Sequence, residues 1–176
     1  GRNGCIIKTM PILDQHKLDF ISHSTEQTQR FGLRLGALLR PGDLICLEGS
    51  LGTGKTCLAQ GVGQGMGVVE PITSPSFTLV NEHVPPPPGP ILYHIDLYRL
   101  DAPMEEALGF GLAEYLSGEG VCLIEWADRI ASGLPRQRLW ITLRYQDAGK
   151  RGFLMEATGP RYDDLLEQFR ASAFGA

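Results

Sequence analysis

The feature that most constrains this chain is a glycine-rich octapeptide, residues 49–56, which matches the pattern G-x-x-x-x-G-K-[ST]. An apolar run, Leu44–Leu47, precedes it, so a buried strand is expected to lead directly into the loop. In such a loop the backbone N–H groups turn inward around an anion, and the following helix directs the positive end of its dipole to the same point. The octapeptide therefore predicts a nucleotide-phosphate site formed by Gly49, Ser50, Leu51, Gly52, Thr53, Gly54, Lys55 and Thr56.

Two side chains of this loop have predicted roles. Lys55 would contact the β- and γ-phosphates, and the Thr56 hydroxyl would bind Mg²⁺. The alternative is a glycine-rich turn that binds nothing, and the expected order of strand, loop and helix favours the phosphate site over it. The helix after the loop carries interior glycines, which cost about 1 kcal/mol each relative to Ala. They indicate either close packing or mobility, and the sequence leaves both explanations open. These glycines are Gly61, Gly63 and Gly65, with Gly67 as the expected cap.

Composition narrows the class of protein. A chain of 176 residues suits one compact domain. The net charge of −4 argues against broad nonspecific adhesion to nucleic acid or membranes. Four cysteines without C-x-x-C spacing indicate thiols in a reducing compartment, so we expect a cytoplasmic protein. No apolar run approaches the ~18 residues that span a bilayer. Because the sequence starts with Gly1, we interpret its first residues as partly foreign or flexible, with Met10 as one native start.

Alternating apolar patterns predict an α/β fold. Ser24 is expected to cap an amphipathic helix, and a short apolar run, Val121–Ile124, is typical of a strand buried on both faces. We expect residues 1–23 to be an N-terminal extension and residues 24–176 to form one domain. The predicted fold is a single three-layer P-loop NTPase domain with a mixed parallel and antiparallel central sheet. The remaining elements are expected as strands at 77–80, 91–98, 139–145 and 153–158, and as helices at 101–117 and 162–174.

Two acidic residues at predicted strand ends are candidates for binding Mg²⁺ and orienting the attacking water. Glu125 follows the buried strand, and Asp96 lies on a strand where His94, Asp96 and Tyr98 would share one face. A charged strand terminus is the alternative for Glu125, and a salt bridge with Arg99 is the alternative for Asp96. The sequence does not decide which of the two acids binds Mg²⁺ directly.

Two other nucleotide-binding classes lack their motifs here. A Ras-like GTPase needs a D-x-x-G turn and an N-K-x-D guanine motif, and this sequence contains neither. The segment Leu116–Gly120 resembles a transporter-ATPase signature, but the Glu125 strand follows at once and leaves no room for the signature helix. We interpret this segment as a helix end.

The ordered motifs together resemble the TsaE (YjeE) family, P-loop ATPases that support threonylcarbamoyladenosine formation in bacterial tRNA. The resemblance covers roughly residues 24–151. Besides the loop, it depends on S-T-E-Q-T at 24–28, T-S-P-S-F at 73–77, H-I-D-L-Y-R at 94–99, I-E-W at 124–126, and Arg151. This sequence departs from the usual family pattern at Ser50, Cys57 and Ser76.

The resemblance implies specific roles. It implies ATP bound at residues 50–56, Mg²⁺ near Thr56 and Glu125, and Asp96 in hydrolysis. It implies a switch-like segment around Ser76, which keeps the hydroxyl of the usual Thr. It also places four further residues close to the nucleotide: Thr25, Thr28, Trp126 and Arg151.

We therefore expect ATP and Mg²⁺ as cofactors, and slow ATP hydrolysis that assists a tRNA-modifying complex. The expected partners are proteins of the tRNA threonylcarbamoyl-transfer complex, of the TsaB and TsaD type. No contact with a membrane is expected. Direct contact with tRNA stays open. Two other functions also stay open: a small-molecule or nucleoside kinase, and a nucleotide-dependent assembly factor whose hydrolysis is incidental.

Overall fold

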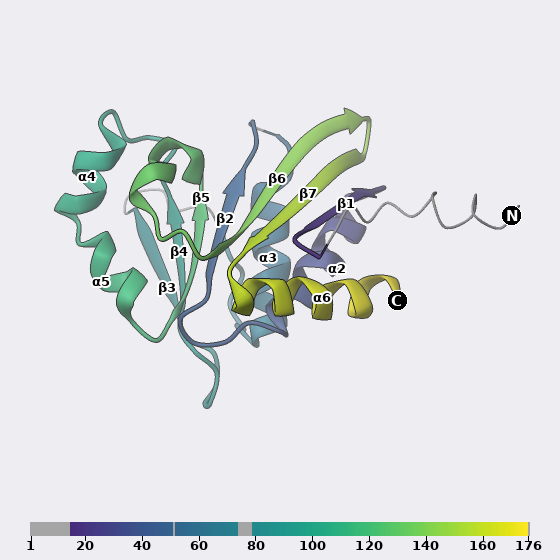
Figure 1. Cartoon of the computed structure of the whole chain (residues 1–176), viewed down its shortest axis with the longest axis horizontal. Coiled ribbons are helices and arrows are strands. Elements are labelled where there is room, and N and C mark those ends of the chain that lie inside the picture. The colour runs from purple at the N-terminus through teal and green to yellow at the C-terminus, as the bar shows by residue number, and fades with distance from the viewer. Residues whose placement is uncertain (1–14, 51, 74–78, 176) are drawn as a thin grey trace, which may run out of the picture.

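The computed structural model describes residues 15–50, 52–73 and 79–175 (Figure 1). Its strands are β1 (Lys17–Ser22), β2 (Leu44–Glu48), β3 (Val80–His83), β4 (Leu92–Asp96), β5 (Val121–Glu125), β6 (Arg138–Asp147) and β7 (Lys150–Thr158). Its helices are α2 (Thr25–Gly36), α3 (Lys55–Met66), α4 (Pro103–Gly109), α5 (Leu112–Ser117), the 3-10 helix η1 (Ala127–Gly133) and α6 (Pro160–Phe174).

The strands of the described residues form one seven-stranded sheet in the order β1-β7-β6-β2-β5-β4-β3. The central pairs β6–β2, β2–β5 and β5–β4 are parallel. The outer pairs β1–β7, β7–β6 and β4–β3 are antiparallel. The mixed central sheet predicted from the sequence is therefore confirmed.

Two hydrophobic cores, one on each face of the sheet, make the fold three-layered. Alternate residues of β2 point to opposite cores, as the period of a strand requires: Ile45 and Leu47 to one, Leu44 and Cys46 to the other. The first core also contains residues of α2, α3 and α6, and the second contains residues of α4, α5 and η1. The loop after β2 therefore begins at the centre of a sheet that is covered on both faces.

Two interior glycines of α3, Gly61 and Gly65, pack against α2, whereas Gly63 packs against Ile72. A Cβ atom at Gly61 would lie 2.1 Å from the Gln29 carbonyl oxygen, and one at Gly65 would lie 2.1 Å from that of Leu33. From the opposite side, a Cβ at Gly36 would lie 2.2 Å from the Val62 carbonyl oxygen. The two backbones touch at these points, so close packing explains the glycines that the sequence alone left open.

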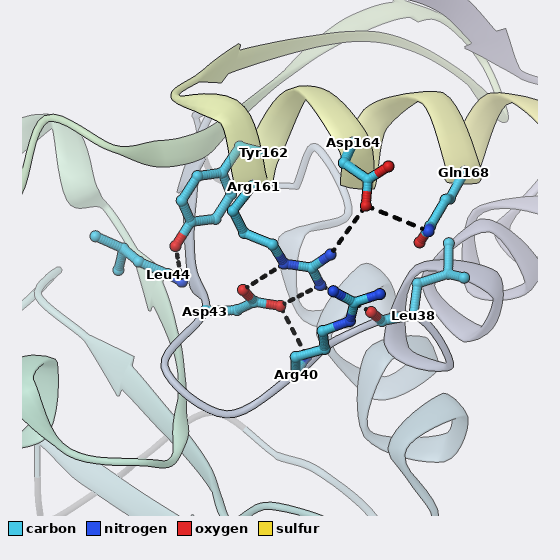
Figure 2. A network of polar contacts seen from close by, with 8 residues as sticks. All are labelled: Leu38, Arg40, Asp43, Leu44, Arg161, Tyr162, Asp164 and Gln168. Carbon is cyan, nitrogen blue, oxygen red and sulfur yellow. Dashed lines mark hydrogen bonds and ion pairs between the residues drawn. The ribbon is translucent and has the colours of Figure 1, made fainter.

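The amino end of β2 is fixed by a buried polar network (Figure 2). Arg161, in the first turn of α6, donates two hydrogen bonds to the Asp43 carboxylate, from Nε at 2.9 Å and from Nη2 at 2.7 Å. The backbone N–H of Arg40 donates to the same carboxylate at 2.8 Å. The Tyr162 hydroxyl accepts a hydrogen bond from the Leu44 N–H. These contacts fasten α6 to the start of the strand that carries the loop.

Four elements differ from the sequence expectation. The strand expected at 77–80 lies partly outside the described residues, and β3 runs over Val80–His83. β1 lies within residues 1–23, which we treated as an extension, but it forms an edge of the sheet because its backbone pairs with β7. The helix expected over 101–117 is divided into α4 and α5 by Gly111, whose φ of 82° ends the helical path. Strand β4 ends at Asp96, so Tyr98 lies beyond it and does not share its face.

Two of the cysteines, on β2 and β5, lie in the second core. Cys46 and Cys122 are buried free thiols, and burial raises the pKa of each to about 12. In the described ranges, no helix is both long and apolar enough to cross a bilayer.

Candidate functional site

The glycine-rich loop joins the carboxyl end of β2 to the first turn of α3. Gly52 and Gly54 have φ values of 81° and 101°, a region that strongly favours glycine. Gly54 stands immediately before the first residue of α3, so the left-handed turn delivers the chain into the helix. The Thr53 hydroxyl donates to the Ser50 carbonyl at 2.8 Å and holds the loop closed on itself. Leu51 lies outside the described residues.

Lys55 begins α3 and folds back over the loop. Its Nζ donates hydrogen bonds to the Gly49 and Ser50 carbonyl oxygens, the latter at 2.9 Å, and lies 4.3 Å from the ring centre of Trp126. Burial lowers the pKa of Lys55, and the charges of Glu125, Asp96 and Asp128 partly oppose this shift. Within the described part of the chain, no carboxylate lies within ion-pair distance of its Nζ. The buried ammonium is therefore held by neutral groups.

The two predicted acids lie side by side. Asp96 and Glu125 are directly opposite each other at the ends of the parallel strands β4 and β5. Burial raises the pKa of Asp96, and the charge of Glu125 adds to that rise, whereas the Tyr98 N–H bonded to the carboxylate lowers it. Glu125 is buried, and its Oε2 lies 2.5 Å from Nε2 of His94. The structure thus brings together the two acids that the sequence placed at strand ends.

These residues fit a magnesium ion that arrives with a nucleotide. Two carboxylates and the Thr56 hydroxyl at the start of α3 are hard oxygen donors, which Mg²⁺ prefers. The described residues contain no cluster of three or more His, Cys, Asp and Glu side chains that could hold a metal ion. In proteins Mg²⁺ is usually bound by one or two carboxylates together with water and phosphate oxygens.

Three residues that the resemblance placed near the nucleotide lie on elements bordering the loop. Arg151 of β7 donates from Nη2 to the Gly52 carbonyl at 3.0 Å, with its guanidinium over the Tyr145 ring. Thr25 opens α2, and its carbonyl accepts a hydrogen bond from Cys57 of α3. Thr28 is buried one turn further on, with its hydroxyl 2.7 Å from that of Ser22. Ser76 lies outside the described residues.

Trp126 follows Glu125 with a φ of 61°, a left-handed conformation that is uncommon for a residue other than glycine. Its ring packs on Lys55 and on Tyr98, 5.0 Å away. Arg129 donates to the carbonyls of Leu97 and Tyr98 and so fixes the segment after β4. A strained backbone conformation persists only where the surrounding structure holds it in place, and such residues are concentrated at functional sites.

Sequence reasoning missed two contacts in this region. It treated His94 only as a polar residue on the face of a strand, although its alternation with Asp96 could have suggested a contact with the neighbouring strand end. Nothing in the sequence pattern pointed to Arg129. Glu48, the last residue of β2, accepts a hydrogen bond from Trp140 Nε1 at 2.8 Å, which is a structural contact.

This chain is similar to a family of known proteins. The family model described as "Threonylcarbamoyl adenosine biosynthesis protein TsaE" matches residues 22–153. The Bacillus subtilis "tRNA threonylcarbamoyladenosine biosynthesis protein TsaE" is 38% identical over 146 residues, covering 81% of this chain and 87% of the relative. The protein of the same description from Treponema pallidum is 42% identical over 132 residues, covering 74% and 94%.

A solved structure supports the same grouping. The crystal structure of Bacillus subtilis YdiB superposes with a TM-score of 0.73 at 35% identity, covering 89% of this chain and 95% of that one. The fold, with its mixed sheet between two helical layers and a loop from β2 to α3, is that of a P-loop NTPase. The family match over residues 22–153 and relatives of 38–42% identity show that this chain belongs to the TsaE family.

Proposed function

We propose that this chain binds ATP·Mg²⁺ at residues 49–56, hydrolyses ATP slowly, and uses that cycle to assist the proteins that form threonylcarbamoyladenosine in tRNA. Membership of the TsaE family and the descriptions of its relatives support the tRNA role. The partners would be proteins of the TsaB and TsaD type. The buried free thiols Cys46 and Cys122 suit a cytoplasmic location.

The observation that carries the proposal is the state of Lys55. A buried ammonium costs free energy, and among the described residues its direct contacts are two carbonyl oxygens and an aromatic face. Phosphate oxygens are stronger partners, because both groups of the hydrogen bond then carry charge. Lys55 would therefore exchange the Gly49 and Ser50 carbonyls for the β- and γ-phosphates of ATP.

The remaining residues have complementary roles. When bound, Mg²⁺ neutralises phosphate charge, and Thr56 with Glu125 or Asp96 would hold it directly or through water. Asp96 would also orient the attacking water and accept its proton, since a carboxyl whose pKa is raised by burial is a better base than an exposed one. Arg151, bonded to the loop at Gly52, would contact the nucleotide from the β6–β7 side. Thr25, Thr28 and Trp126 would border the nucleotide on the other sides.

A calorimetric titration with ATP and Mg²⁺ tests the binding step. Lys55→Ala removes the buried cation of the loop, and we expect the free energy of ATP binding to weaken by about 4 kcal/mol, roughly a thousandfold in affinity. Lys17→Ala is the control, because Lys17 is a half-buried lysine on the edge strand β1, away from the loop, and its loss should leave affinity unchanged. Equal ATP affinity of the Lys55→Ala variant and the unmodified chain would refute the phosphate-loop assignment.

A second experiment separates the three candidate functions. ATP hydrolysis would be measured with and without TsaB- and TsaD-type proteins, and partner binding would be measured with an ATP analogue, with ADP and without nucleotide. We expect partner affinity to depend on the nucleotide, and Ser76→Ala to weaken that dependence more than it weakens ATP binding. Equal partner affinity in all three states would eliminate the switch, and phosphoryl transfer to a small metabolite would favour a kinase.

A further inference from the structure

One buried histidine lies directly beneath the candidate magnesium site. His94 of β4 is fully buried, and its Nε2 lies 2.5 Å from Oε2 of Glu125 on the neighbouring parallel strand. His94 is opposite Leu123 in the register, two residues before Glu125. Because side chains two apart on a strand share a face, His94 and Glu125 belong to successive layers on the same side of the sheet.

Packing alone does not explain a histidine at this position. The neighbouring residues of β4, Leu92 and Ile95, are fully buried and apolar. The second ring nitrogen of His94, Nδ1, is buried and has no hydrogen-bond partner in the described part of the chain. An unsatisfied buried polar atom costs free energy that an apolar side chain of similar size would avoid. The contact with Glu125 is therefore the feature that the histidine supplies.

The contact constrains one half of the Glu125 carboxylate. Nε2 must donate, since a carboxylate oxygen can only accept, and the neutral tautomer with its proton on Nε2 avoids a buried N–H at Nδ1. Among the described residues, none donates a hydrogen bond to the other oxygen, Oε1. A carboxylate held at one oxygen keeps its rotamer and leaves the second oxygen available to a cation.

We infer that His94 is a positioning residue: it holds Glu125 by Oε2 so that Oε1 is oriented for Mg²⁺ or a water bound to it. This inference rests on the proposed function, since it presumes that Mg²⁺ reaches the site with ATP. His94 itself contacts neither nucleotide nor metal in this scheme. It acts through the carboxylate, as hydrogen-bonded outer partners of metal ligands do.

The chain contains a matched comparison. His83 of β3 is also buried, lies 3.2 Å by Nδ1 from a glutamate oxygen of Glu70, and has a buried second nitrogen, Nε2, with no hydrogen-bond partner among the described residues. It stands opposite Leu92, at the end of β4 remote from Asp96. A variant at His83 therefore reproduces the loss of a buried histidine and of its contact with a glutamate, here an exposed one, without touching the site.

The test measures the affinity of an ATP analogue with Mg²⁺ and with EDTA for the unmodified chain and for His94→Leu, His94→Gln and His83→Leu. We expect His94→Leu to reduce the gain in affinity from Mg²⁺ by about tenfold, with affinity in EDTA unchanged. His94→Gln, whose side-chain amide still donates, should recover most of the gain. His83→Leu should keep all of it, even where it loses thermal stability.

The outcomes separate this inference from the function beneath it. If the unmodified chain gains no affinity from Mg²⁺, the proposed function fails together with the inference. If it gains affinity and His94→Leu gains equally, or if His83→Leu loses as much, only the positioning role is overturned.

A second measurement needs no variant. Nitrogen-15 NMR of the imidazole rings should show His94 protonated on Nε2, and this signal should shift when Mg²⁺ and the analogue are added while that of His83 stays in place. An unchanged His94 signal in the saturated complex would overturn the inference.

Discussion

The two ends of strand β2 hold their buried charges in different ways. At the amino end, Asp43 accepts two hydrogen bonds from Arg161, and these bonds raise the pKa of the guanidinium. At the carboxyl end, Lys55 is bonded to two backbone carbonyls and lies on an aromatic ring, although Asp96 and Glu125 are near enough to influence its pKa.

The difference shows how the partners of a buried charge can distinguish a structural ion pair from a binding site. In the Asp43–Arg161 pair the two charged groups are bonded to each other, and the pair fastens α6 to the start of β2. A buried cation held by neutral groups keeps its charge available, and a phosphate can replace those groups at a gain. Under the proposed function, a structural charge therefore lies at one end of this strand and a functional charge at the other.

The largest expected effect concerns the ion pair of Asp43 and Arg161. Arg161→Met leaves the Asp43 carboxylate buried without its cation, and we expect the free energy of unfolding to fall by about 3 kcal/mol. ATP affinity should stay unchanged, because the network lies at the other end of β2. Urea denaturation measures the first quantity and calorimetry the second.

The control for this variant is Arg34→Met. Arg34 also connects a helix to α6, through Ser172, but it is exposed, so its loss should cost less than about 1 kcal/mol. Equal destabilisation by both variants would show that the buried ion pair contributes no more to the free energy of unfolding than the exposed contact does.

A smaller effect is expected where α3 touches α2. Gly61→Ala places a methyl group 2.1 Å from the Gln29 carbonyl, so the two helices must separate, at a cost of about 2 kcal/mol in the free energy of unfolding. Gly109→Ala is the matched control, since nothing lies within 4 Å of its added Cβ and the change should be neutral or slightly stabilising. A Gly61→Ala protein as stable as the unmodified chain would mean that the contact is looser than described.

The smallest effect concerns the acids at the functional end. Glu125→Gln keeps the shape of the side chain but removes its charge, and we expect the gain in ATP affinity from Mg²⁺ to fall about tenfold, or 1.4 kcal/mol. Magnesium titrations of the nucleotide complex measure it. If the Mg²⁺ dependence is intact in this variant and lost in Asp96→Asn, Asp96 is the principal magnesium ligand and Glu125 is not.

Most features of the fold and the site that the sequence predicts come from patterns among neighbouring residues. The loop at 49–56 follows from a fixed motif, and the position of Asp96 and Glu125 at strand ends follows from the apolar runs that precede them. The pairing of β1 with β7 and the contact between Asp43 and Arg161, 118 residues apart, depend on which distant segments meet. A single sequence contains no periodicity that encodes such meetings, and the same limit hid the contact of His94 with Glu125, 31 residues away.

The most direct test of the account is a structure of this chain with a non-hydrolysable ATP analogue and Mg²⁺. We predict that Lys55 Nζ leaves the Gly49 and Ser50 carbonyls and contacts the β- and γ-phosphates, while the bonds between Arg161 and Asp43 stay as they are. An analogue bound elsewhere, or Lys55 still bonded to both carbonyls with the analogue in the loop, would contradict the assignment of Lys55 as the functional charge.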